Sequence, residues 1–295
     1  MKLKTYPTKI HKAEKRTSFT HTSMLRSAIL IFLLFFPVTF VKLFLHEAGH
    51  AIFHLGQGAP VHFLYAHPFS FVGYVRPMPM AYYNNVWLHA SGTVFELLVS
   101  GVIFILLWKC RSFYTLPLLM IFPWAALYNG LGGIFGILGH SGDDHNIMII
   151  TGWSPLTFYI PNLILSVVGI FFLISLFPLL GLKPEDRKSL FVLPVGMLLY
   201  TALGLLIAYL FVPGSPIDVQ YHVAREIITS VNSRPIFMGS VGILLAFIYI
   251  TLYRSLYRRI HANLRTENLD LTWKDLRLPA LLAAVNVILG ILIIP

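Results

Sequence analysis

Seven long apolar runs recur along this chain of 295 residues, and they constrain its fold more than any other feature. Each run has about the 20 residues that a helix needs to cross the hydrocarbon core of a bilayer. The runs cover residues 27–54, 85–108, 113–139, 155–182, 190–212, 236–253 and 278–295. A segment inside a bilayer has to satisfy its own backbone hydrogen bonds, so the pattern predicts an all-α polytopic membrane protein with about seven transmembrane helices.

The composition excludes a water-soluble fold. Hydrophobic residues make up 57% of the chain, charged residues make up 12%, and the mean hydropathy is +0.74. A soluble globular chain carries about 25% charged residues, so this chain has too few to cover its surface. The same figures exclude a disordered chain and a disulfide-stapled secreted module. Because Cys110 is the only cysteine, a metal site would have to use His, Asp or Glu.

The formal net charge of +10 does not predict nucleic-acid binding, because the basic residues lie between the apolar runs. Of the 22 Lys and Arg residues, eighteen fall on the same side of the membrane as the N-terminus, three fall on the other side, and Lys42 falls inside the first span. Basic residues accumulate in cytoplasmic loops, so we expect a cytoplasmic N-terminus. The expected location is an integral, multi-pass protein in the lipid bilayer, at the cell membrane if the source is bacterial.

The motif His46-Glu47-Ala48-Gly49-His50 lies near the end of the first predicted span. Residues four positions apart share one face of a helix, so both imidazoles can bind one metal ion. Glu47 can then reach a water molecule on that ion. Zinc lowers the pKa of such a water, and a carboxylate acts as its general base. Three ionisable groups on an apolar helix are costly in lipid, which favours a functional site over chance.

A zinc hydrolase usually has three protein ligands and one open position. The best source of a third ligand is the segment 139–145, Gly-His-Ser-Gly-Asp-Asp-His, which follows the third span. The first and third spans both run outward in the expected topology, so Asp143 or Asp144 should lie in the same leaflet as His50. Glu96 is the competing candidate, but it lies near the middle of the second span and should be deeper than the histidines.

Other ionisable residues of the first two spans have open roles. Glu96 has to pair, be protonated or serve the site, since an isolated carboxylate in a span is unfavourable. Lys42 precedes His46 by four residues on the same face, and a cation there needs a carboxylate partner such as Glu96. His54 continues the face of His50 and is either a supporting residue or an interfacial histidine.

The interval 60–80 predicts a short membrane-associated β hairpin after the first helix. It is rich in aromatic and β-branched residues and has His67-Pro68 near its middle. Non-helical backbone at membrane depth is tolerated only inside protein or along a wet cavity. Two interpretations stay open: an edge that binds an extended peptide by strand addition, or an interfacial loop anchored by aromatic side chains.

Several of these motifs together resemble the site-2 protease family of intramembrane zinc metalloproteases. They are the HEAGH motif, the hairpin-like interval, the Ala-Ser-Gly-Thr run at 90–93, and Asn129 ahead of the acidic segment. The resemblance covers residues 38–151, and HEAGH is its specific element. The resemblance implies Zn²⁺ as cofactor, with His46, His50 and Asp143 as its ligands and Asp144 as the alternative third ligand. It implies that Glu47 is the general base. It also implies supporting roles for Glu96, Asn129, His54 and Gly73.

The chain departs from the family pattern in four respects. Asn129 lies fourteen residues before Asp143 with no proline between them, and Asp144 stands where the family has glycine. The Gly-x-Gly of the family hairpin is reduced to Gly73-Tyr74-Val75, and no stretch is expected to form a PDZ domain. We therefore expect a divergent, compact member.

The predicted function is an intramembrane zinc metalloendopeptidase that cleaves a transmembrane or membrane-anchored protein substrate. The alternative is a non-catalytic metal-binding membrane protein, either a transporter or a pseudoprotease that binds substrates. A transporter would place ionisable residues in several spans, and a pseudoprotease would lack the general base. The expected organisation is one membrane domain, with a basic cytoplasmic segment at 1–26, the metalloprotease core at 27–151 and four further transmembrane helices at 152–295.

Overall fold

The computed structural model describes residues 21–66, 73–77, 85–182, 189–211, 238–249, 251 and 271–292. Most of the basic segment 1–26 lies outside these residues, as do parts of the fifth, sixth and seventh predicted spans. The described elements, in chain order, are α1 (His21–Gly56), β1 (Val61–Ala66), β2 (Gly73–Pro77), α2 (Val86–Leu107), the 3-10 turn Trp108–Cys110, α3 (Leu116–Leu138), α4 (Asp143–Thr151), α5 (Pro155–Leu176), the 3-10 turn Phe177–Leu180, α6 (Ser189–Phe211) and α9 (Arg277–Leu292).

Four helices in the described part of the chain are long and apolar enough to cross a membrane. They are Ser23–Gly56, Val86–Cys110, Leu116–Leu138 and Pro155–Leu180, and they coincide with the first four predicted spans. The apolar helix Met238–Tyr249 falls in the sixth predicted span, and α6 and α9 overlap the fifth and seventh. The apolar helices indicate a membrane protein.

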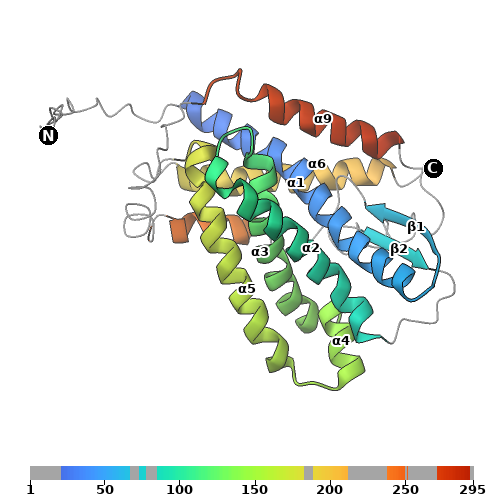
Figure 1. Cartoon of the computed structure of the whole chain (residues 1–295). Helices are drawn as coiled ribbons and strands as arrows, with labels where there is room; N and C mark the ends of the chain where they lie inside the picture. The colour runs from blue at the N-terminus through green and yellow to red at the C-terminus, as the bar shows by residue number, and fades with distance from the viewer. Residues whose placement is uncertain are drawn as a thin grey trace, which may run out of the picture.

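Helix α1 is the centre of the packing. It contacts α2, α3, α6 and α9, and both strands also lie against it. Figure 1 shows α1 running beneath α9 and reaching the two strands, while α2, α3 and α5 form a group of neighbouring helices. A change in the position of α1 would therefore directly disturb α2, α3, α6, α9 and both strands.

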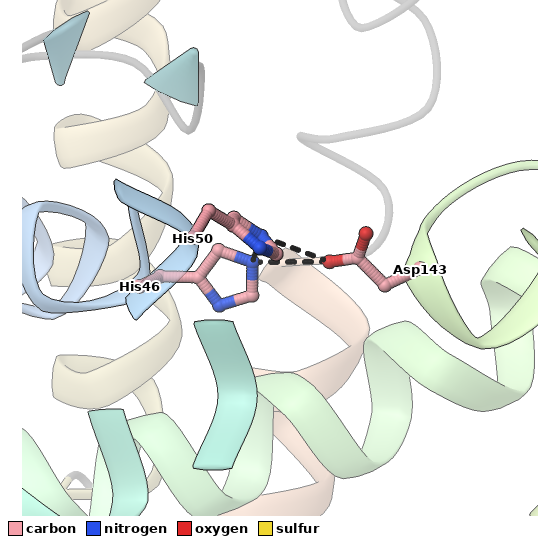
Figure 2. Close-up of side chains that lie close together, drawn as sticks. All are labelled: His46, His50 and Asp143. Atoms are coloured by element: carbon pink, nitrogen blue, oxygen red, sulfur yellow. Dashed lines mark hydrogen bonds and ion pairs between the residues drawn. The ribbon is translucent and has the colours of Figure 1, made fainter. Parts of the chain in front are cut away.

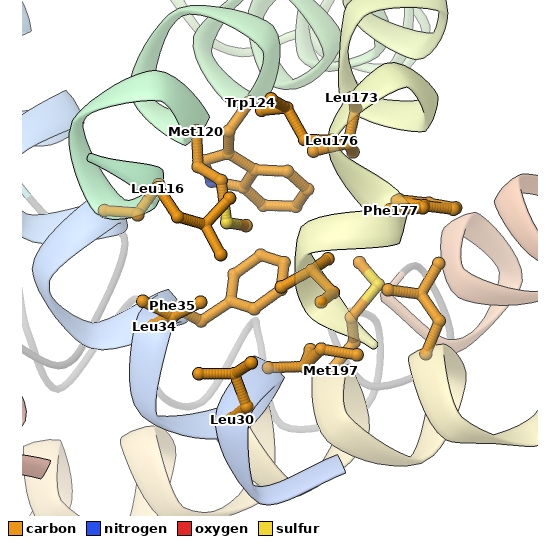
Figure 3. Close-up of a cluster of buried hydrophobic side chains, with 14 of the residues drawn as sticks. Leu30, Leu34, Phe35, Leu116, Met120, Trp124, Leu173, Leu176, Phe177 and Met197 are labelled. Carbon is orange, nitrogen blue, oxygen red and sulfur yellow. The ribbon is translucent and has the colours of Figure 1, made fainter. Parts of the chain in front are cut away.

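A cluster of large apolar side chains fixes the N-terminal half of α1 (Figure 3). Phe35 packs edge-on against Trp124 of α3, with ring centroids 4.8 Å apart. Leu34 of α1, Leu176 of α5 and Met197 of α6 close the cluster, and all of these side chains are buried. In a bilayer such packing is stabilised by dispersion contacts rather than by exclusion of water. The cluster lies eleven residues, or about 16 Å along the helix, before His46, so it holds the helix that carries the histidines.

Helices α3 and α5 approach each other closely at two glycines. A Cβ on Gly169 would lie 2.8 Å from both Leu127 Cα and Pro123 O, and a Cβ on Gly130 would lie 2.5 Å from Asn162 O. Small residues are what allow transmembrane helices to pack backbone to backbone. Because α4 follows α3 directly, this contact also determines where the acidic segment at 143–144 lies.

We expect Gly169→Ala to lower stability, because a methyl group there would push α3 away from α5. Overpacking of this kind costs about 1–3 kcal/mol. The measurement is the thermal unfolding midpoint of the purified protein in detergent. Gly132→Ala is the matched control, since a Cβ at Gly132 would come no closer than 3.9 Å to Tyr128 Cε1. Equal midpoints for the two variants would contradict this packing.

The strands β1 and β2 pair in antiparallel fashion within the interval 60–80. Leu64 pairs with Val75 and Ala66 pairs with Gly73, and the register is irregular between Val61 and Phe63. The segment that joins the strands, with His67-Pro68, lies outside the described residues. Both strands contact α1, so the non-helical backbone lies beside the helix that carries the HEAGH motif.

Candidate metal centre

The C-terminal half of α1 presents His46 and His50 with their rings in defined orientations. His46 Nδ1 donates a hydrogen bond to Glu96 Oε2 at 3.1 Å, and His50 Nδ1 donates to the backbone oxygen of Leu88 at 2.8 Å. Carboxylate and carbonyl oxygens only accept, so each neutral imidazole carries its hydrogen on Nδ1. In a neutral ring with its hydrogen on Nδ1, the Nε2 atom has a lone pair, which is the form that binds a metal ion.

The two Nε2 atoms and one oxygen of Asp143 converge (Figure 2). His46 Nε2 lies 3.3 Å from His50 Nε2, and Asp143 Oδ2 lies 3.1 Å from the first and 3.5 Å from the second. Ligand atoms placed 2.0–2.1 Å from a tetrahedral zinc ion are about 3.3 Å apart. The three atoms thus have the spacing of three ligands around one such ion.

Asp143 reaches this position because the chain reverses sharply after α3. His140 and Gly142 have positive φ angles of 55° and 83°, and Ser141 N donates to Gly136 O at 2.8 Å. Asp143 is the first residue of α4 and faces α1. Its other oxygen, Oδ1, accepts a hydrogen bond from His89 Nδ1 at 3.0 Å.

The carboxyl group of Asp143 is held in its charged form. Burial by itself would raise its pKa, but the side chains of His46, His50 and His89 around it hold the pKa well below the usual range. A charged oxygen beside two imidazole lone pairs is the donor set that borderline metal ions such as zinc prefer.

The neighbouring Asp144 points elsewhere. Its Oδ2 accepts a hydrogen bond from Asn162 Nδ2 of α5 at 2.7 Å. Burial raises the pKa of Asp144, and the hydrogen bond from Asn162 opposes that shift. The structure therefore places Asp143 with the two histidines and Asp144 against α5.

Glu96 and Asn129 lie on the opposite side of the His46 ring from Asp143. Glu96 is fully buried, and its Oε2 accepts from Asn129 Nδ2 at 3.1 Å as well as from His46 Nδ1. Lys42 Nζ lies 3.4 Å from the same oxygen, which supplies the carboxylate partner that this cation needs. Glu96 thus contacts the ring nitrogen that faces away from the convergent atoms.

Three further residues that were predicted to belong to the site lie outside the group of convergent atoms. Glu47 is buried, with 7% of its surface exposed, and directly follows His46 on α1. His54 is buried one turn beyond His50, and its Nδ1 has no hydrogen-bond partner among the described residues. Gly73 is the first residue of β2. None of these three is in the group His46, His50 and Asp143 that could hold a metal ion.

His89 is a further residue of the centre that was not predicted from the sequence. This side chain of α2 is buried and binds Asp143, and Asn146 Nδ2 lies 3.5 Å from His89 Nδ1. The available signal was an ionisable residue inside a predicted span, which by default suggests a functional site. Nothing in the spacing of the sequence connects residue 89 with residue 143, because that contact forms only when α2 and α4 pack.

No family model matches this sequence, and no curated protein or solved structure matches it either. The assignment of a function therefore depends on the chemistry of the residues described above.

Helix α2 passes close to the convergent atoms because residue 92 is glycine. A Cβ on Gly92 would lie 2.5 Å from His50 Nε2 and 2.9 Å from His46 Nε2. The approach is reciprocal, since a Cβ on Gly49 would lie 2.9 Å from Gly92 Cα and 2.8 Å from Phe95 Cβ. Gly49 of HEAGH and Gly92 thus form a backbone-to-backbone crossing of α1 and α2 at the candidate metal centre.

We expect Gly92→Ala to lower the zinc affinity by at least about tenfold, as changes beside metal ligands commonly do. The new methyl group would lie against both Nε2 atoms, and the rings cannot turn away without breaking their Nδ1 hydrogen bonds. The measurement is competition for zinc with a chromophoric chelator. Gly101→Ala on the same helix is the control, because its Cβ would lie 3.5 Å from Phe122 Cδ2, an ordinary contact. Equal affinities in the two variants would argue against this arrangement.

Proposed function

We propose that this protein is an intramembrane zinc metalloendopeptidase. The observation that carries the proposal is the triangle of donor atoms from His46, His50 and Asp143, with sides of 3.1, 3.3 and 3.5 Å. This spacing supports a tetrahedral ion with three protein ligands. A fourth position would be left for water, as in catalytic rather than structural zinc sites.

The chemistry follows from the residues around that position. When bound, zinc lowers the pKa of a coordinated water and polarises a peptide carbonyl. Glu47 would act as the general base that accepts a proton from the attacking water, and would then deliver it to the nitrogen of the departing peptide. Asp143 adds one negative charge to the ligand set, and its hydrogen bond from His89 keeps its second oxygen occupied.

The substrate that we propose is a transmembrane or membrane-anchored protein. His46, Glu47 and His50 lie inside the apolar helix Ser23–Gly56, so a peptide bond has to reach membrane depth to meet them. The strands β1 and β2, which lie against α1, offer an edge for an extended segment. We further propose about seven spans, a cytoplasmic N-terminus and, in a bacterial source, a place in the cell membrane.

The metal content of detergent-purified protein tests the ligand set. We expect about one zinc per chain in wild type and little in His46→Ala or Asp143→Asn, since each change removes a donor atom. Asp144→Asn is the matched control, because that carboxylate faces Asn162, and it should retain zinc. Well-folded wild type without zinc would contradict the proposal. Loss of zinc in Asp144→Asn but not in Asp143→Asn would identify Asp144 as the third ligand.

The role of Glu47 is tested with Glu47→Gln, which should retain zinc but lower peptide cleavage by at least about a hundredfold. The readout is quantitative mass spectrometry of membrane-protein fragments in cells that carry either wild type or the variant in place of the native gene. New chain ends within or beside apolar segments should appear only with wild type. Identical fragment sets from zinc-loaded proteins would instead favour a non-catalytic metal-binding protein, such as a transporter or a pseudoprotease.

A further inference from the structure

A buried polar cluster lies behind His46, on the side away from Asp143. It consists of Lys42 from α1, Glu96 from α2 and Asn129 from α3. Lys42 is 3% exposed and Glu96 is fully buried. Lys42 Nζ lies 3.4 Å from Glu96 Oε2 and 3.4 Å from Asn129 Oδ1, so all three side chains are connected.

This cluster is costly for a chain that sits in a bilayer. Removing two charges from water is expensive, and a well-packed apolar set of the same volume is often as stable or more stable than a buried ion pair. Ionisable residues inside membrane spans are therefore rare and are commonly functional. The aromatic ring of Tyr128, whose centroid lies 4.4 Å from Lys42 Nζ, further stabilises the cation in place.

Three side chains converge on one oxygen atom of this cluster. Glu96 Oε2 is the common acceptor for His46 Nδ1, Asn129 Nδ2 and Lys42 Nζ. Its second oxygen, Oε1, is buried and has no hydrogen-bond partner among the described residues. A carboxylate whose role was only to neutralise Lys42 would not need to orient the same oxygen toward an imidazole.

The two histidines are oriented from the same face of α2. Leu88, Gly92 and Glu96 are spaced four residues apart and so lie on successive turns of one helix face. Leu88 O accepts from His50 Nδ1, Glu96 accepts from His46 Nδ1, and Gly92 leaves room for the two Nε2 atoms between them. His50 is held by a neutral carbonyl, whereas His46 is held by a charged group that needs Lys42 as its counter-ion.

We propose that Glu96 is a positioning residue that fixes the ring of His46 with Nε2 toward the metal, and that Lys42 and Asn129 hold Glu96 in place for this purpose. The inference rests on the proposed zinc site and adds to it a carboxylate–histidine–metal relay. Partners of this kind set the orientation of a metal-ligating histidine and increase its basicity. The net charge of Lys42 and Glu96 together is zero, so the relay adds no uncompensated charge to the membrane interior.

Two double variants separate the positioning role from simple charge burial. Lys42→Met with Glu96→Gln and Lys42→Met with Glu96→Leu both remove the two charges, so neither leaves an unpaired ion. Only the Gln variant retains an oxygen that can accept from His46 Nδ1. We expect the Leu variant to bind zinc about 10- to 100-fold more weakly than the Gln variant, with similar thermal midpoints.

The measurements are zinc affinity by chelator competition and the visible absorption of the Co²⁺-substituted protein, which reports ligand geometry. The Leu variant should show altered cobalt bands, and the Gln variant should restore bands close to those of wild type. Ser100→Ala is the control, because this buried hydroxyl one turn further along α2 donates only to the backbone oxygen of Glu96, at 2.6 Å. It should bind zinc as wild type does.

Equal zinc affinity and equal cobalt spectra in the two double variants would overturn the positioning role while leaving the metal site intact, provided that wild type binds zinc. Wild type without zinc would overturn both the proposed function and this inference. If the Leu variant does not fold, Lys42→Met with Glu96→Met takes its place, since methionine has a similar length and only a weak acceptor. The same comparison with the Gln variant then decides the question.

Discussion

The crossing of α1 and α2 at Gly49 and Gly92 is the contact on which the rest of the candidate metal centre depends. Without side chains at these two positions the helix backbones touch, and the imidazoles of α1 then lie within reach of acceptors on α2. A wider crossing would separate His46 from Glu96 and His50 from Leu88. Small residues at a helix crossing usually serve packing alone, but here they also bring acceptors to the imidazoles of His46 and His50.

The second determinant is the position of α4. This helix of nine residues packs against both α2 and α3, and a four-residue turn separates it from α3. Helix α3 is in turn fixed by its close contact with α5 and by the aromatic cluster against α1. The location of Asp143 is thus set by the packing of α3 and α4 together with the sharp turn at 139–142.

Much of this arrangement follows from the sequence, for local reasons. The first four apolar helices are predicted by length and hydropathy, and His46 and His50 share a face because a helix repeats every 3.6 residues. The expected topology places Asp143 or Asp144 near the histidines without separating the two, and only the family resemblance favours Asp143. That choice depends on Asn162, which binds Asp144, and on His89, which binds Asp143. The sequence predicted only that Lys42 needs a carboxylate partner such as Glu96, since nothing in one sequence shows which spans are neighbours.

The residues of the candidate centre come from parts of the chain that are synthesised at different times. Two of them lie within one turn of α1 and are in place as soon as that helix forms, whereas Asp143 lies 97 residues after His46. A metal ion that met the nascent chain would find only these two donor atoms until α2, α3 and α4 had formed and packed. Tight metal retention would then mark completed assembly, and an incompletely folded molecule would remain free of metal.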